Sequence, residues 1–490
     1  MKFDRGRILI ALAFLLAIYL RLNDIEGKNM WFDEVYSWNT SQYDLEGIVK
    51  SAAGDIHPPF YYMVLKWWTY FTGDSVFSMR LLSVVFSILS MVFIYKISYD
   101  ILKNDTQVFF VFILYALSPI NIHYAQEVRM FMMNTFLCLG SVYYFLGLLE
   151  NPSLQRKVLY VLFSLLAIYT HYFAFLILFT EFLVVAYRQF KNRKDLSLTK
   201  NIAPLFGVVL VLYLPWFPEF FRQVSAGQPW RVPQDLLTWS KNTFAFFKDI
   251  IFSYFVYYKA GLIYKAANGV TLLIIASYFI GMFMAFKRKL LTGKLALVTV
   301  FFIIPFAIAV IISFRNSLLL SRYISIIIPY FIISFVAFAF MLKSRKLTYV
   351  MIIPFILASM VGMKFNYEMN FKNNDYRGVI SYLEENYNAG DRIVVEPHYM
   401  GWSIKYHNIR GETNLPVPDI IDYSFRGIID SLGNAPDMKK LWFVLDYSSL
   451  GDDGYDEVTE KMEAIGFKKE EEAVFEVVPD EVRVYYFVRE

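Results

Sequence analysis

The sequence predicts an all-α, multi-pass membrane domain of about 11 transmembrane helices, followed by a small extracytoplasmic α/β domain. Composition gives the first reason. Apolar residues make up 57% of the 490 residues and charged residues only 18%, whereas soluble chains carry about 25% charged residues. The mean hydropathy of +0.42 and the gathering of apolar residues into long runs give the second. The acidic, soluble-like composition of residues 366–490 gives the third.

Charge divides the chain in two. The formal net charge is only +4, but residues 366–490 contain 25 acidic and 13 basic residues, so residues 1–365 carry the opposite sign. The basic residues are dispersed between apolar runs, which is unlike the clustered patch of a nucleic-acid-binding protein. The single cysteine, Cys138, excludes an intramolecular disulfide. We therefore predict a transmembrane domain in residues 1–365, including an extracytoplasmic loop at 23–74, and a soluble domain in residues 366–490.

Eleven apolar segments are candidates for crossing the bilayer. Several are shorter than the roughly 20 residues that a hydrocarbon core requires, so the count is approximate. The first follows three basic residues, as in a signal peptide, but lacks the small residues of a cleavage site, and we expect it to be a retained helix. The segments are 8–22, 75–98, 106–120, 127–149, 157–171, 172–187, 201–217, 266–286, 293–313, 323–342 and 347–365.

The distribution of lysine and arginine predicts the orientation. With a cytoplasmic N-terminus, the short connections on the inside contain 19 basic residues, whereas those on the outside contain only Arg315 and Arg322. Basic residues favour cytoplasmic loops. The soluble domain is therefore expected outside the cytoplasm, and the protein in the cell membrane.

Two long loops and the soluble domain complete the architecture. Loop 23–74 is rich in aromatic residues and predicts short interfacial helices. Loop 218–265 has six basic and three acidic residues, which fits either a solvated loop or contact with an anionic lipid or ligand. In the soluble domain, periodicity predicts helices at 377–387 and 457–467 and strands at 391–396, 440–447, 474–478 and 482–488, the last two paired.

Polar and ionisable residues from five separate segments are predicted to meet at the extracytoplasmic face. Such groups near membrane depth are costly and usually functional. Each also has a structural alternative: an interfacial charge, a turn before proline, a helix-end histidine or a snorkelling arginine. Soluble-enzyme motifs such as a P-loop, a Gly-rich dinucleotide turn, Cys/His metal spacing or Gly-x-Ser-x-Gly are absent from the sequence. The segments contain Asp33 and Glu34; His57; Tyr124, Gln126, Glu127 and Arg129; His171 and Tyr172; and Arg322 and Tyr323.

Several motifs in these segments resemble the GT-C superfamily of integral-membrane glycosyltransferases. They are Trp31-Phe-Asp33-Glu34, His57-Pro-Pro-Phe-Tyr61-Tyr62, Ser118-Pro119 before Tyr124-Ala-Gln-Glu-Val-Arg129, and Arg322-Tyr323 with Pro329. These motifs occur in the same order along residues 1 to about 365 as in one branch of the superfamily. The chain is thus similar to the branch that contains the dolichyl-phosphate-mannose protein mannosyltransferases and the lipid A aminoarabinose transferase. Asp375-Tyr-Arg-Gly-Val379 also looks like the tail of bacterial and archaeal members.

The resemblance implies sugar transfer from a polyprenyl (dolichyl or undecaprenyl) phosphate donor to a protein, lipid or glycan acceptor. In this family an acidic pair in the first long loop lies at the active site. The resemblance therefore implies that Asp33 is the general base and that Glu34 supports it. The aminoarabinose transferase has Lys-Pro where this chain has His57-Pro58, so the phosphate role of His57 is not given by the motif. No motif requires a cofactor, although Asp33 or Glu127 could bind a divalent cation. The expected donor-binding and phosphate-binding residues are His57, Tyr61, Tyr124, Gln126, Glu127, Arg129, His171, Tyr172, Arg322 and Tyr323.

Two other classes of function fit many membrane spans. A lipid or sugar-lipid transporter would also carry intramembrane charges, but it predicts inverted repeats or broken helices meeting near the midplane. The sequence contains no such repeat. A nonenzymatic scaffold would leave the aromatic, acidic loop without a role. The nature of the sugar and of the acceptor is left open by the sequence.

Overall fold

The computed structural model describes residues 5–226, 233–253, 261–342, 344–368, 375–396, 401–416, 439–446, 454–476 and 481–489. The chain divides into two compact units. The helical unit comprises Met1–Ile25 and Asp44–Glu368, and the C-terminal unit comprises Glu26–Tyr43 and Met369–Glu490. The sequence assigns all of loop 23–74 to the transmembrane domain, and that division stays a prediction; the contacts group part of the loop with the C-terminal residues.

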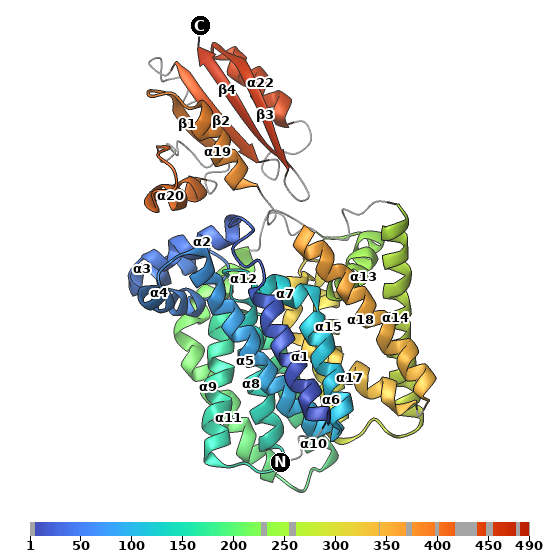
Figure 1. Ribbon diagram of the computed structural model, residues 1–490. Coiled ribbons are helices and arrows are strands. Elements are labelled where there is room, and N and C mark those ends of the chain that lie inside the picture. The colour runs from blue at the N-terminus through green and yellow to red at the C-terminus, as the bar shows by residue number, and fades with distance from the viewer. Residues whose placement is uncertain are drawn as a thin grey trace. The chain divides into compact units, whose positions relative to one another are not determined.

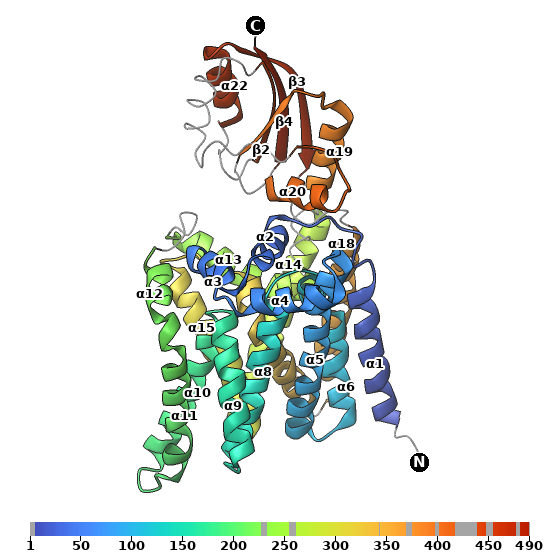
Figure 2. The same cartoon turned by 90° about the vertical axis from the view of Figure 1, so that its left-hand side faces the viewer.

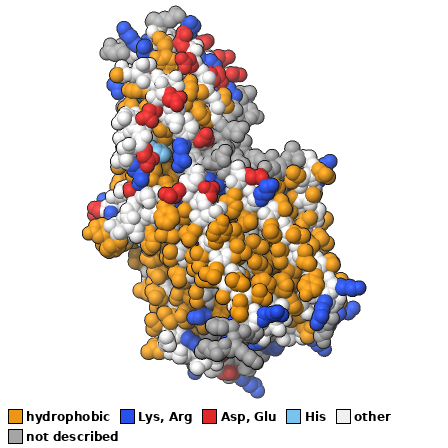
Figure 3. Space-filling view, in the orientation of Figure 1, with side chains coloured by type: hydrophobic (Ala, Val, Ile, Leu, Met, Phe, Trp, Pro, Cys, Tyr) orange, Lys and Arg blue, Asp and Glu red, His pale blue; other side chains and the backbone are white. Residues whose placement is uncertain are grey.

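The helical unit consists of long helices that run side by side, with short helices at one end of them (Figures 1 and 2). On the face seen in Figure 3, most of the side chains over the long helices are apolar. The helices are α1 (Arg5–Leu22), α3 (Leu45–Gly54), α4 (Phe60–Thr72), α5 (Val76–Leu102), α6 (Asp105–Leu117), α7 (Pro119–Ala125), α8 (Phe131–Leu148), α9 (Leu154–Thr170), α10 (Ala174–Lys191), α11 (Ser197–Tyr213), α12 (Phe217–Ala226), α13 (Leu236–Phe252), α14 (Leu262–Lys287), α15 (Gly293–Ser313), α16 (Ser321–Ile324), α17 (Ile328–Met341) and α18 (Arg345–Glu368).

Each of the eleven predicted spans falls on one of these helices, but the number eleven is not confirmed. Within the described residues, seven helices are long and apolar enough to cross a membrane, or eight if α6 and α7 form one bent span. Helix α9 has only 17 residues, and α1 and α10 each contain three charged residues. The structure confirms a multi-pass membrane protein.

The break between α6 and α7 turns the chain by 58°. Pro119 occupies the first position of α7 and holds Ser118 in extended geometry, which ends α6. The last carbonyls of a helix need partners from outside it. The buried Arg21 guanidinium donates to the carbonyls of Tyr115 and Ala116 at 3.2 and 3.4 Å, so a cation from α1 stabilises the bend.

The C-terminal unit is built on a four-stranded sheet of order β1-β2-β4-β3. Strands β1 (Arg392–Glu396) and β2 (Lys440–Asp446) are parallel; β4 (Glu481–Arg489) is antiparallel to both β2 and β3 (Phe467–Glu476). Helix α19 (Tyr376–Asn386) packs on one face and α22 (Gly454–Ala464) on the other. Alternate residues of β2 supply the two cores, Trp442 and Val444 to one and Leu441, Phe443 and Leu445 to the other.

The predicted helices and strands of this unit are confirmed, with three differences. The helix predicted at 457–467 covers Gly454–Ala464, so that Phe467 belongs to the next strand. Strand β3 begins at Phe467 instead of 474, because its first half is a charged edge strand without the expected alternation. Helix α20 (Gly401–Ile409) was not predicted. It packs against α2 (Phe32–Gln42), one of the short helices expected in loop 23–74.

Candidate functional site

A cluster of three aromatic rings joins separate segments of the helical unit. The ring centroids of His57 and His171 lie 5.2 Å apart, and those of His171 and Tyr323 lie 5.1 Å apart. The His57 and Tyr323 rings lie 6.1 Å apart, edge to face. All three residues are buried. We call these residues the ring cluster, and the sequence had predicted each of them as part of one site.

Local geometry explains how two of the rings reach the cluster. His57 precedes Pro58-Pro59, and Pro59 is the N-cap of α4, so prolines fix the chain on its C-terminal side. His171 is the extended C-cap of α9. Its Nδ1 accepts the Phe173 amide N–H at 3.2 Å, which leaves the proton of the neutral ring on Nε2.

Phe131 and Arg129 extend the ring cluster, and the sequence had predicted only Arg129 as a site residue. The Phe131 ring lies 5.2 Å from Tyr124, 6.1 Å from His171 and 6.3 Å from Tyr323. The Arg129 guanidinium carbon lies 5.9 Å from the centre of the Phe131 ring. Phe131 looks in the sequence like an ordinary core residue of α8, so only the packing shows its bridging position.

Arg322 lies against the same cluster. Its guanidinium carbon is 5.3 Å from the Tyr323 ring centre. The preceding Ser321 donates a hydrogen bond to the Asp249 carboxylate of α13. Asp249 and Arg322 are both electrostatic neighbours of the Tyr124 hydroxyl. Asp249 is therefore a further acidic residue beside the site, and its position in the long loop 218–265 gave no signal for this.

Glu127 and Gln126 make contacts that shape the backbone of the site. The Glu127 carboxylate lies 2.9 Å from Nε2 of His123, with both side chains buried, and His123 Nδ1 lies 3.2 Å from Asn366 Oδ1. The His123–Glu127 spacing of four residues was visible in the sequence but overlooked. The Gln126 amide donates to the carbonyls of Arg21 and Asn23 at 3.1 and 2.7 Å.

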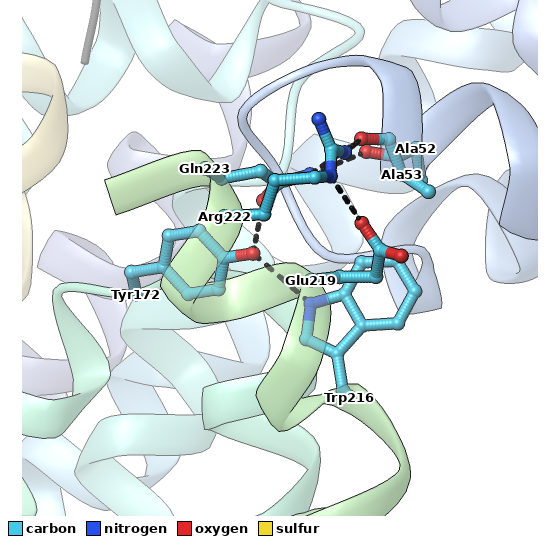
Figure 4. A network of polar contacts seen from close by, with 7 residues as sticks. All are labelled: Ala52, Ala53, Tyr172, Trp216, Glu219, Arg222 and Gln223. Atoms are coloured by element: carbon cyan, nitrogen blue, oxygen red, sulfur yellow. Dashed lines mark hydrogen bonds and ion pairs between the residues drawn. The ribbon is translucent and has the colours of Figure 1, made fainter. Parts of the chain in front are cut away.

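Tyr172 belongs to a separate polar network, shown in Figure 4. Its hydroxyl accepts the Trp216 Nε1 proton at 3.0 Å and donates to the Gln223 side-chain carbonyl. The Gln223 amide donates to the carbonyls of Ala52 and Ala53 at 2.8 and 3.1 Å. The network ties α12 to the end of α3. Tyr61, in contrast, is buried edge to face against Tyr62 in α4.

A cavity of about 570 Å³ lies beside the ring cluster. Its polar lining comes from His57, His171 and Tyr323 together with Tyr172, Gln223, Ser225 and Asn316. The rest of the wall is mostly apolar, with side chains from α10, α12 and α15. The cavity can thus take a ligand with a polar head beside the rings and an apolar part along the helices.

Asp33 and Glu34 lie in the first turn of α2, in the C-terminal unit. The buried Glu34 carboxylate accepts the backbone N–H of Trp31 at 3.4 Å, so it caps the start of the helix. Asp33 is half-buried, and its carbonyl accepts the Ser37 hydroxyl at 2.9 Å. The two carboxylates of this motif therefore have different surroundings.

The described part of the chain contains no group of three or more His, Cys, Asp or Glu side chains that could hold a metal ion. In the basic loop 218–265, Arg222 pairs with Glu219 at 2.7 Å. Lys248 donates to Tyr264 and Asn268, each at 3.1 Å. Arg231 and Lys259 lie outside the described residues.

Known structures share the fold of this chain. ArnT from Cupriavidus metallidurans matches with a TM-score of 0.58 in its apo state and 0.54 with undecaprenyl phosphate bound. Both matches are 13% identical and cover 98% of this chain, and 98% and 97% of the two ArnT chains. The oligosaccharyltransferase AglB from Archaeoglobus fulgidus, in complex with an inhibitory peptide and a dolichol-phosphate, matches at 11% identity with a TM-score of 0.54. That match covers 90% of this chain and 69% of AglB. The chain therefore shares the fold of these two transferases.

A family model narrows the resemblance. The model of the dolichyl-phosphate-mannose-protein mannosyltransferases matches residues 56–218, the part that contains His57, Tyr124, Arg129 and His171. No curated protein sequence matches the chain. The chain therefore resembles the GT-C glycosyltransferases of the branch that contains the protein mannosyltransferases and ArnT, as its motifs predicted.

Proposed function

We propose that this protein transfers a sugar from a polyprenyl phosphate, dolichyl or undecaprenyl, to a protein, lipid or glycan acceptor at the extracytoplasmic face of the membrane. The observation that carries the proposal is the ring cluster beside a largely apolar cavity. The Arg322 guanidinium lies against the Tyr323 ring, and that of Arg129 lies against the neighbouring Phe131 ring. A polyprenyl phosphate matches both features, because its phosphate is a polar, charged group and its isoprenoid chain is apolar. Two fold relatives contain such a lipid, undecaprenyl phosphate in ArnT and dolichol-phosphate in AglB.

The reaction needs a base for the acceptor. An acceptor hydroxyl oxygen forms a bond to the anomeric carbon, the bond from that carbon to the phosphate oxygen breaks, and the hydroxyl proton goes to a carboxylate. The family resemblance assigns this role to Asp33, whose half-buried side chain stands at the start of α2. Glu34 caps the same helix turn. We propose that it supports Asp33 by stabilising this turn.

The leaving polyprenyl phosphate needs positive charge or hydrogen-bond donors. Arg322 and Arg129 are permanent cations, and His171 in its neutral form carries a donor on Nε2. Charge-assisted hydrogen bonds to phosphate are about twice as strong as neutral ones. Arg322, Arg129, His57 and His171 are therefore the proposed phosphate-binding residues, with Tyr124, Tyr172 and Tyr323 as further donor contacts. Tyr61, Gln126 and Glu127 stay predictions from the sequence.

The proposal is tested with the purified protein in lipid nanodiscs, a panel of labelled polyprenyl-phosphate sugars, and protein, lipid and glycan acceptors supplied with each donor. We expect release of the carrier phosphate from at least one donor, and loss of that release in Asp33→Asn. A panel of dolichyl and undecaprenyl donors from which the wild-type protein releases no phosphate would contradict the proposal.

A further inference from the structure

The helix that carries the proposed base packs on a helix of the C-terminal unit. Trp402 of α20 stacks on Phe32 of α2, with ring centroids 6.0 Å apart and an angle of 15° between the planes. The same Trp402 ring lies 5.5 Å from Tyr36. Phe32 also packs against the core between α19 and the sheet. The beginning of α2 is thus fixed by aromatic contacts to residues more than 300 positions away in the sequence.

The contact continues along both helices. The Lys405 ammonium donates to the Asn39 side-chain carbonyl at 3.1 Å, and the Tyr406 ring lies 5.0 Å from Trp38, edge to face. Phe32, Tyr36 and Asn39 are spaced by four and three residues, which places them on one side of α2. On α20, Lys405 and Tyr406 follow Trp402 by three and four residues, which places these side chains on one side of that helix.

A helix held along one side cannot turn about its own axis. Asp33 follows Phe32 by one residue, which places its side chain about 100° around the helix from the side that contacts α20. The contact with α20 therefore sets the direction in which the Asp33 carboxylate points. Glu34 reinforces this, since its carboxylate caps the same turn.

We propose that α20 positions the catalytic base, with Trp402 as the principal positioning residue and Lys405 and Tyr406 as its partners. This inference rests on the proposed function of Asp33. It gives the C-terminal unit a defined task in sugar transfer: the unit holds the helix that bears the base. Trp402 acts through α2 and takes no part in the bond changes.

The test compares Trp402→Ala with Trp402→Phe and with Ile409→Ala, a substitution of an exposed side chain on the same helix. Turnover and the acceptor KM are measured in the full-length protein, together with hydrogen exchange of the backbone amides in α2. For Trp402→Ala we expect a kcat about 10- to 100-fold lower with the acceptor KM little changed, because a misplacement of about 1 Å costs on that order. Amide exchange in α2 should become faster, while exchange in β2 and β4 stays slow.

Trp402→Phe should recover most of the turnover because it keeps a stacking ring, and Ile409→Ala should match the wild type. An unchanged kcat despite faster exchange in α2 would overturn the positioning role. A raised acceptor KM at unchanged kcat would overturn it too, and would point to acceptor binding by Trp402. If the wild-type protein releases no carrier phosphate, the proposed function fails. The exchange measurement then still decides whether α20 anchors α2, and unchanged exchange in Trp402→Ala would contradict the anchoring.

Discussion

The ring cluster and the contact between α2 and α20 are assembled in opposite ways. The ring cluster gathers residues from a turn, a helix end and a short helix, each from a separate segment of the helical unit. The contact between α2 and α20 is a match between two helices along regularly spaced side chains. The first collects rings and cations, which suit a phosphate; the second presents a carboxylate, which suits a base. The two chemical tasks are thus given to parts of the protein that are stabilised differently.

The largest effect should come from Asp33→Asn, which removes the base. We expect turnover to fall by about 10² to 10⁴-fold, the range of a general-base contribution, while insertion into the membrane and donor binding stay normal. Single-turnover kinetics with labelled donor measure this. Glu34→Gln is the matched control, because an amide oxygen can still accept the Trp31 N–H. Equal losses in both variants would contradict the separate roles of the two carboxylates.

Arg322→Ala should have the next largest effect. Removing a cation from the phosphate should raise the donor KM by about 10- to 100-fold, the equivalent of the roughly 1.5–3 kcal/mol given to a hydrogen bond to a charged group. The control is Arg315→Ala, an exposed arginine seven residues earlier, which should leave the donor KM unchanged. Donor titrations of both variants distinguish the roles. An unchanged donor KM in Arg322→Ala would make Arg322 a structural residue.

Tyr172→Phe tests the network that joins α12 to α3 (Figure 4). The change removes the hydroxyl that accepts from Trp216 and donates to Gln223. We expect the free energy of unfolding to fall by about 1–3 kcal/mol, because buried polar partners lose a hydrogen bond. Tyr70→Phe is the control, since this side chain is 76% exposed, and it should change stability by less than about 0.5 kcal/mol. Denaturant unfolding followed by fluorescence compares the two.

The smallest effect is a pH dependence of the C-terminal unit. Burial lowers the pKa of His407 below its usual 6.5, although the carboxylate of Glu412 lies 2.6 Å away. The charges of Arg377 and Arg410 act in the same direction as burial. The folded state then binds fewer protons than the unfolded state, so stability is full above pH 6.5 and falls as the pH decreases towards the lowered pKa.

Thermal unfolding of the full-length protein between pH 7.5 and 5.5 measures this dependence. His407→Gln should flatten it, because glutamine does not titrate. Stability that rises as the pH decreases through this range in the wild-type protein would contradict the sign of the shift.

The sequence predicted elements well where periodicity was long, and site contacts poorly where they depend on packing. Long apolar runs identified the membrane helices, and alternating residues identified the strands of the C-terminal unit. The polar motifs identified His57, His171 and Tyr323, which the structure brings together. Phe131 and Asp249 were missed because an apolar residue in an apolar helix, or an acid in a long loop, has no local pattern. Helix α20 was missed because nine residues with Trp402 and Tyr406 four apart make too short a pattern.

The central claim is chemical transfer, and its most direct test separates transfer from transport. The purified protein is placed in proteoliposomes with a labelled polyprenyl-phosphate sugar, and release of carrier phosphate is measured beside movement of the intact lipid across the bilayer. We predict phosphate release that requires an acceptor and is lost in Asp33→Asn. Movement of intact donor across the bilayer, without phosphate release and unchanged in Asp33→Asn, would contradict the claim and identify a transporter.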